Sequence, residues 1–212
     1  GLSSEPRVEE MADKAAHVTM LQRTPSWYII RPRKDRIANL LRKLLPAEFS
    51  RAAVLVPIVD RPGGLTILLT QRASHLKNHP GQVSFPGGRV EATDAGPWET
   101  ALRETEEEIG LGREHVSLAG YLVDHFVISG YLVTPAVAFV RTGFELKLDL
   151  TEVDEVFEVP LEFVLDPANH VPRERRFGGH TFKAFDIPYQ RHNIWGATAG
   201  MLMTLYRMLR EG

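Results

Sequence analysis

Residues 87–111 read GGRVEATDAGPWETALRETEEEIGL, and this stretch predicts the centre of both the fold and the chemistry. It opens with a glycine pair, where a main chain can approach a ligand closely. Residues 97–109 predict a helix, because Pro97 suits a first helical turn and Gly110 suits the position after a last turn. At about 100° per residue, three carboxylates share one face of this helix. They are Glu104, Glu107 and Glu108.

Three like charges at this spacing repel one another and destabilise an isolated helix. A hard divalent cation explains such a cluster, because Mg²⁺ binds a few carboxylates together with waters and substrate phosphates. The cluster therefore predicts a site for Mg²⁺ or Mn²⁺, and an acidic helix face exposed to water is the alternative. Arg103 stands four residues before Glu107, so we expect these two side chains to pair.

The segments on both sides of this loop and helix predict strands and further helices. Strands are predicted at 52–59, 65–70, 116–123 and 131–140, around 82–85, and as a pair within 171–187. Helices are predicted at 36–45, 160–165 and 197–209. Strands before, between and after isolated helices indicate the α/β class, as an α+β mixed sheet sandwiched by helices.

Length and composition exclude several kinds of protein. The chain has 212 residues, and we expect residues 1–50 to be an N-terminal extension with a helix on the core and residues 51–212 to be the catalytic domain. It has no cysteine, which excludes disulfides, thiolate metal sites and cysteine nucleophiles. A net charge of −2 predicts no nucleic-acid partner, and no apolar run predicts membrane insertion or a secretory signal. We therefore expect a cytoplasmic protein with a small-molecule substrate, and a homodimer stays open.

From Gly88 to Leu111 the sequence resembles the Nudix hydrolase signature. That signature is Gly, five residues, an acid, seven residues, then Arg-Glu-apolar-any-Glu-Glu-any-Gly-apolar. Here the acid is Asp94, eight residues precede Arg103, and Thr105 stands at an apolar position. The resemblance implies a Nudix fold and metal-dependent hydrolysis of a diphosphate bond. It implies catalytic roles for Arg103, Glu104, Glu107 and Glu108, and a metal site at Glu104, Glu107, Glu108 and Gly88.

A second motif resembles the coenzyme A pyrophosphatase subfamily of these hydrolases. The chain has Leu-Leu-Thr-Gln-Arg-Ala at 68–73, then Lys77, Gly81 and Phe-Pro-Gly-Gly at 85–88, with all the spacings of that motif. Ala73 replaces a serine of the motif, and Lys77 replaces an arginine and loses its bidentate fork. The resemblance implies cleavage of coenzyme A or acyl-CoA to 3′,5′-ADP and (acyl-)4′-phosphopantetheine. The implied substrate-binding residues are Arg72, Lys77, Gly81, Phe85 and Gly87.

The sequence leaves several roles open. One carboxylate should act as base for the attacking water, and Glu108, Glu152 and Glu155 are the candidates. His75 and His79 lie in the substrate-binding loop, where they can contact phosphate or form ordinary hydrogen bonds. Four aromatic residues are candidates either for the core or for stacking on adenine. They are Phe126, Phe177, Tyr189 and Trp195.

Three other functions are compatible with the same fold. The chain could hydrolyse ADP-ribose or a dinucleoside polyphosphate, although the motif at 68–88 favours coenzyme A. It could be a non-catalytic nucleotide sensor, although a sensor need not keep the whole glutamate cluster. Isomerisation of isoprenoid diphosphates is the third, and its reliance on cysteine argues against it here.

Overall fold

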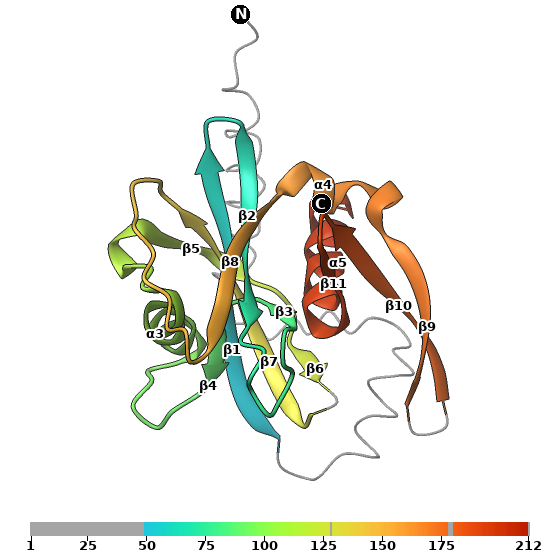
Figure 1. Cartoon of the computed structure of the whole chain (residues 1–212), viewed down its shortest axis with the longest axis horizontal. Helices are drawn as coiled ribbons and strands as arrows, with labels where there is room; N and C mark the ends of the chain where they lie inside the picture. The colour runs from blue at the N-terminus through green and yellow to red at the C-terminus, as the bar shows by residue number, and fades with distance from the viewer. Residues whose placement is uncertain (1–48, 128, 178–179, 212) are drawn as a thin grey trace, which may run out of the picture.

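A computed structural model of the chain describes residues 49–127, 129–177 and 180–211. Its main element is a large mixed sheet, with strand order β3-β2-β1-β7-β5 and three further strands paired to it (Figure 1). These strands are β1 (Ser50–Arg61), β2 (Gly64–Arg72), β3 (Val83–Ser84), β4 (Gly87–Arg89), β5 (Val116–Tyr121), β6 (His125–Val127), β7 (Tyr131–Val140) and β8 (Val153–Pro160).

Strand β1 runs through the middle of this sheet and pairs in parallel with β7, whereas its pairing with β2 and β4 is antiparallel. Successive side chains of a strand point to opposite faces. Val56 and Ile58 accordingly join one buried cluster, and Ala53 and Leu55 join another on the other face. Both faces of β1 are therefore buried, which explains its nearly continuous apolar sequence.

A helix covers each face of the large sheet (Figure 1). Helix α3 (Pro97–Ile109) packs Ala101 and Ile109 against one face, and helix α5 (Gly196–Glu211) packs Leu202 and Leu205 against the other. Helix α4 (Leu161–Leu165) lies on the α5 side with its buried Val164. The predicted mixed sheet between helices is thus confirmed.

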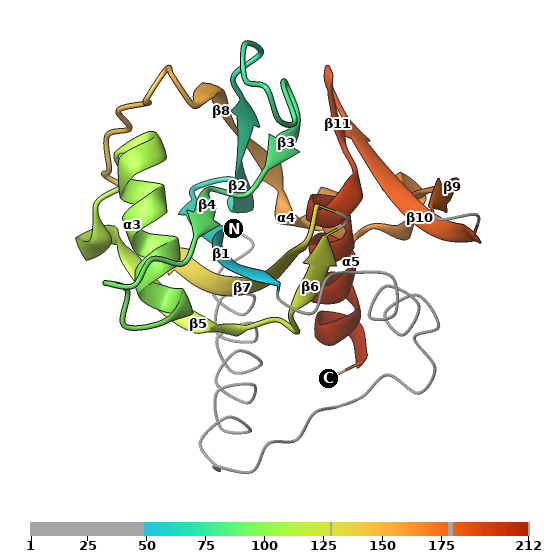
Figure 2. The same ribbon diagram turned by 90° about the horizontal axis from the view of Figure 1, so that it is seen from below.

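A second, smaller sheet contains β9 (Val171–Phe177), β10 (His180–Tyr189) and β11 (His192–Ile194), all antiparallel. Its inner face is fixed to the core by Ile187 and Ile194, which are fully buried. Strand β11 contacts β3, so the small sheet lies beside the loop that precedes the glycine pair (Figure 2). The 3₁₀ turns at Arg113–His115 and Pro167–Asn169 complete the described elements.

Most predicted elements are confirmed, with changes at their ends. Helix 97–109 has the predicted bounds, and Gly110 adopts the left-handed conformation (φ 69°) with its N–H donated to the Glu106 carbonyl. The sequence did not predict β4, β6, β8 or β11. The predicted helix at 36–45 and the division at residue 50 concern a region that lies almost entirely outside the described residues. No described helix is long and apolar enough to cross a membrane.

Candidate active site

The glycine pair is held against helix α3 by the pairing of β4 with β1, in which Gly88 lies opposite Ala53. The Gly87 N–H donates to the Glu108 carboxylate at 3.1 Å. A Cβ on Gly87 would overlap the Ala53 carbonyl, and a Cβ on Gly88 would overlap the Glu104 carboxylate. Gly87 is therefore needed for the close approach to β1, and Gly88 for the close approach to Glu104.

Glu108 is the most buried member of the glutamate cluster, with 5 % of its surface exposed. Burial, together with the negative charges of Glu152 and Glu104, raises the pKa of its carboxyl to about 8. The Gly87 N–H and the positive charge of Arg72 act in the opposite direction. Side chains from β2, from α3 and from the turn before β8 thus affect one buried carboxyl group.

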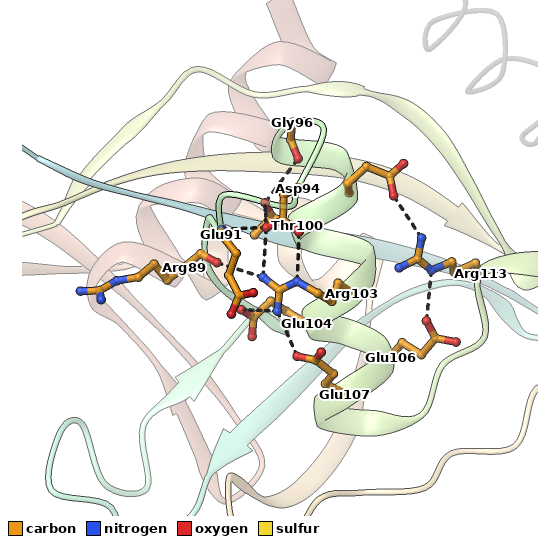
Figure 3. A network of polar contacts seen from close by, with 11 residues as sticks. Arg89, Glu91, Asp94, Gly96, Thr100, Arg103, Glu104, Glu106, Glu107 and Arg113 are labelled. Atoms are coloured by element: carbon orange, nitrogen blue, oxygen red, sulfur yellow. Dashed lines mark hydrogen bonds and ion pairs between the residues drawn. The ribbon is translucent and has the colours of Figure 1, made fainter.

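Arg103 lies at the centre of a polar network on the same side of the helix (Figure 3). Its Nε and Nη2 donate to the Asp94 carboxylate at 3.0 and 3.1 Å, and its Nη1 lies 3.0 Å from both the Glu104 and the Glu107 carboxylates. Nη2 also donates to the Arg89 carbonyl. The predicted Arg103–Glu107 pair is confirmed, and the same guanidinium links the signature loop to the helix.

Asp94 has a structural role that the residue pattern alone did not reveal. Its carboxylate is 4 % exposed and also accepts hydrogen bonds from the Glu91 N–H and the Thr100 hydroxyl. The Arg103 guanidinium therefore holds the pKa of Asp94 well below its usual range. The acidic position of the signature was the available signal, and the extra residue before Arg103 does not prevent this contact.

The cluster has the chemistry of a divalent-cation site, since buried carboxylates at raised pKa gain stability from a nearby positive charge. Burial raises the pKa of Glu104 as well as that of Glu108. In the part of the chain that the structure describes, however, no three Asp, Glu or His side chains form a closed metal cage. Arg103 holds Glu104 and Glu107, and Glu107 is 60 % exposed. The metal roles of these glutamates and of Gly88 therefore stay predictions.

The residues of the second motif lie in different environments. Arg72 ends β2 close enough to Glu108 to lower its pKa, whereas Lys77 is exposed in the following loop. Gly81 lies in a tight turn with φ 66°, and its N–H donates to the Arg72 carbonyl. Phe85 is 3 % exposed and packs in the core, so its side chain positions the glycine pair and offers little surface to a ligand.

The structure separates the two later candidates for the base. Glu152 is exposed, and its charge raises the pKa of both Glu104 and Glu108. Glu155 instead pairs with Arg191 and with His192, so its carboxylate serves the packing of β11 on β8. Glu152 thus stays a candidate for the base, whereas the Glu155 carboxylate is engaged by Arg191 and His192. His75 and His79 are both exposed in the loop that follows β2.

The structure thus holds a Gly-Gly loop against a glutamate-bearing helix beside a mixed sheet. The model of the NUDIX domain matches residues 49–178. The chain is also 40 % identical over 157 residues to a protein described as an uncharacterized Nudix hydrolase, NudL, from Enterobacter sp. (strain 638), covering 73 % of this chain and 80 % of that one. A NudL from Escherichia coli (strain K12) is 39 % identical over 155 residues, with the same coverage of both chains. The chain belongs to the Nudix family.

Solved structures to which this chain is similar are more distant in sequence. An Ap4A hydrolase binary complex from C. elegans is 24 % identical with a TM-score of 0.46, over 52 % of this chain and 80 % of that one. The NUDIX domain of Shewanella oneidensis NrtR, complexed with ADP ribose, is 21 % identical with a TM-score of 0.43, over 61 % of this chain and 83 % of that one. The family membership makes this chain a Nudix pyrophosphatase that acts on small molecules, and Nudix hydrolases generally depend on a divalent metal.

Proposed function

We propose that this Nudix hydrolase cleaves the diphosphate of coenzyme A or an acyl-CoA, releasing 3′,5′-ADP and (acyl-)4′-phosphopantetheine. The supporting observation is that the second motif ends beside the glutamate cluster. The Arg72 charge acts on the Glu108 carboxyl, and the Arg72 N–H donates to the Gln82 carbonyl across the loop at 3.0 Å. A substrate phosphate beside Glu108 would therefore lie close to the Arg72 guanidinium, the first positive charge of the motif.

In this proposal Glu104, Glu107 and Glu108 hold Mg²⁺ or Mn²⁺, with the main chain at Gly88 beside them. A cation bound there would neutralise charge on the phosphoryl oxygens and lower the pKa of a bound water. Arg103 keeps Glu104 and Glu107 on the loop side of the helix. Positioning and charge stabilisation account for most of the catalysis of phosphoryl transfer, so these contacts are the main contribution of the protein.

The phosphates and the attacking water are handled by other residues. Arg72 and Lys77 hold phosphate oxygens that the cation does not neutralise. Glu152 is the proposed base, because its exposed carboxylate can accept the water proton while the cluster holds the cation. Gly81 and Gly87 shape the main chain of the loop, and buried Phe85 fixes its position.

The test compares coenzyme A, ADP-ribose and a diadenosine polyphosphate, each with Mg²⁺, with Mn²⁺ and with chelator, followed by chromatography of the products. Glu108→Gln is the site variant. Glu106→Gln is the matched control, because Glu106 lies on the same helix but pairs with Arg113 on its outer side (Figure 3). Metal-dependent release of 3′,5′-ADP, lost only in Glu108→Gln, supports the proposal.

The other outcomes contradict parts of the proposal. Cleavage of ADP-ribose without cleavage of coenzyme A supports the metal site but rejects coenzyme A as the substrate. Absence of turnover with every substrate, despite metal binding, rejects coenzyme A hydrolysis and favours a nucleotide sensor. Equal loss of activity in Glu106→Gln and Glu108→Gln rejects the assignment of the site to one helix face.

A further inference from the structure

The outer face of the small sheet carries an exposed aromatic residue next to arginines. Trp195 follows β11 directly and is 39 % exposed. The guanidinium carbon of Arg175, from β9, lies 5.3 Å from the centre of the Trp195 ring. Indole rings and guanidinium planes both stack on planar groups, so this pair can extend into a stack with a third planar partner.

A buried carboxylate fixes the position of this pair. Asp186, on β10, accepts a hydrogen bond from Arg175 Nη2 at 2.7 Å and one from Asn193 Nδ2 at 3.3 Å, and its carboxylate lies 3.5 Å from Arg173 Nε. The Asp186 side chain is almost fully buried, whereas Arg173 and Arg175 are partly exposed. Two guanidinium groups against one carboxylate leave one net positive charge on this face.

The Trp195–Arg175 pair lies next to the substrate-binding loop. A Cβ on Gly196 would stand 3.4 Å from the Gln82 side chain, and the Thr198 hydroxyl donates to the Val83 carbonyl at 3.0 Å. Gln82 is the residue whose carbonyl accepts from Arg72. Short contacts therefore connect the segment that follows Trp195, through Gln82 and Val83 of the loop, to Arg72, whose positive charge acts on Glu108.

The other aromatic candidates are less suited to contact a ligand. Phe126 stacks edge-on against Phe49, and Tyr189 packs edge-on against Phe163 beside the core. The side chain of Phe177 lies outside the described part of the chain. Of the aromatic side chains that the structure describes among these candidates, Trp195 has the exposed ring and the neighbouring positive charge.

We propose that Trp195, Arg175 and Arg173 form a subsite for the nucleoside half of the substrate, where a purine base stacks on the Trp195–Arg175 pair and a phosphate on that nucleoside contacts Arg173. This inference rests on the proposed function, because it assigns the base and the phosphate of the same substrate. The positive charge of the face complements the phosphate, and stacking accepts any planar base.

Calorimetric titration with adenosine 3′,5′-bisphosphate in the presence of chelator tests the subsite without catalysis. Trp195→Ala and Arg175→Ala should each weaken binding by about tenfold, the effect of losing one stacking contact, and Trp195→Phe should restore most of it. Leu150→Ala is the control for Trp195, since Leu150 is an exposed apolar residue elsewhere. Arg113→Ala is the control for Arg175, since both are exposed arginines paired with carboxylates. Adenosine and inorganic phosphate, titrated separately, should each bind more weakly than the bisphosphate.

The outcomes for the subsite and for hydrolysis can be distinguished. Binding that depends on Trp195 in a protein that cleaves no diphosphate supports the subsite and rejects the proposed function. Hydrolysis of coenzyme A with the same KM in Trp195→Ala as in Leu150→Ala rejects the subsite and leaves the function standing. No detectable binding of the bisphosphate to the wild-type protein also rejects the subsite.

Discussion

Replacing Asp94 by asparagine should destabilise the protein more than any comparable change at an exposed ion pair of the same helix. Asparagine keeps the size of the side chain and removes its charge. The Asp94 carboxylate is almost completely buried against the Arg103 guanidinium, with two N–H···O bonds of 3.0 and 3.1 Å. Breaking one partner of a buried pair costs about 3–5 kcal/mol.

The expected cost for Asp94→Asn is smaller than that range. Arg103 keeps its contacts with Glu104 and Glu107, and an asparagine oxygen can still accept one hydrogen bond. We therefore expect the free energy of unfolding to fall by about 2 kcal/mol. Glu106→Gln should cost less than about 1 kcal/mol, because its pair with Arg113 is exposed. Urea unfolding at neutral pH, with unchanged slopes for all variants, measures both values.

The dependence on pH gives a second check of the same contact. The folded-state pKa of Asp94 lies below its unfolded value, so its contribution to stability is fully present above the unfolded pKa of about 3.9. That contribution is lost as the pH falls toward the folded pKa. The difference between wild type and Asp94→Asn should therefore shrink in acid. A difference no larger than that of Glu106→Gln, or one that does not change with pH, would refute the reasoning.

Three further predictions concern the helix and its loop. Gly88→Ala should lower kcat/KM at least tenfold, by about 1.4 kcal/mol or more, because the added Cβ overlaps the Glu104 carboxylate, whereas Gly63→Ala, which meets no atom, should leave kcat/KM unchanged. Thr105→Val should change the free energy of unfolding by less than about 1 kcal/mol, because the buried Thr105 hydroxyl donates only to a main-chain carbonyl one helical turn back. Without metal, the unfolding temperature should fall as the pH rises from about 4.3, the unfolded pKa of a glutamate, toward the folded Glu108 pKa of about 8. The reason is that over this range the folded protein keeps the Glu108 proton that the unfolded chain has lost. Glu108→Gln should remove this dependence on pH.

Elements with local signals were predictable from the sequence. Pro97 and Gly110 mark the two ends of α3, and both positions agree with the structure. Strand β8 was missed, because its acidic residues interrupt the apolar pattern. One of them, Glu158, accepts hydrogen bonds from Arg61 of β1 and Thr66 of β2, which a local pattern cannot show.

The site was predictable to the extent that one helix forms it. The spacing of Arg103 and Glu107 indicated their contact, because residues four apart are neighbours on a helix. The Asp94–Arg103 contact can be predicted only when the path of the loop is known. The Trp195–Arg175 pair can be predicted only when the pairing of β9 with β10 is known. Such contacts join residues far apart in the sequence, so they appear only once the strand register is known.

The most direct test of the account is a titration with Mn²⁺, in which electron paramagnetic resonance measures the free ion. The protein should bind Mn²⁺, and Glu108→Gln should weaken that binding by about tenfold or more, whereas Glu106→Gln on the outer side of the same helix should bind as the wild type does. Equal Mn²⁺ affinity in all three proteins would contradict the central claim, because the glutamate cluster would then be an acidic surface and not a metal site.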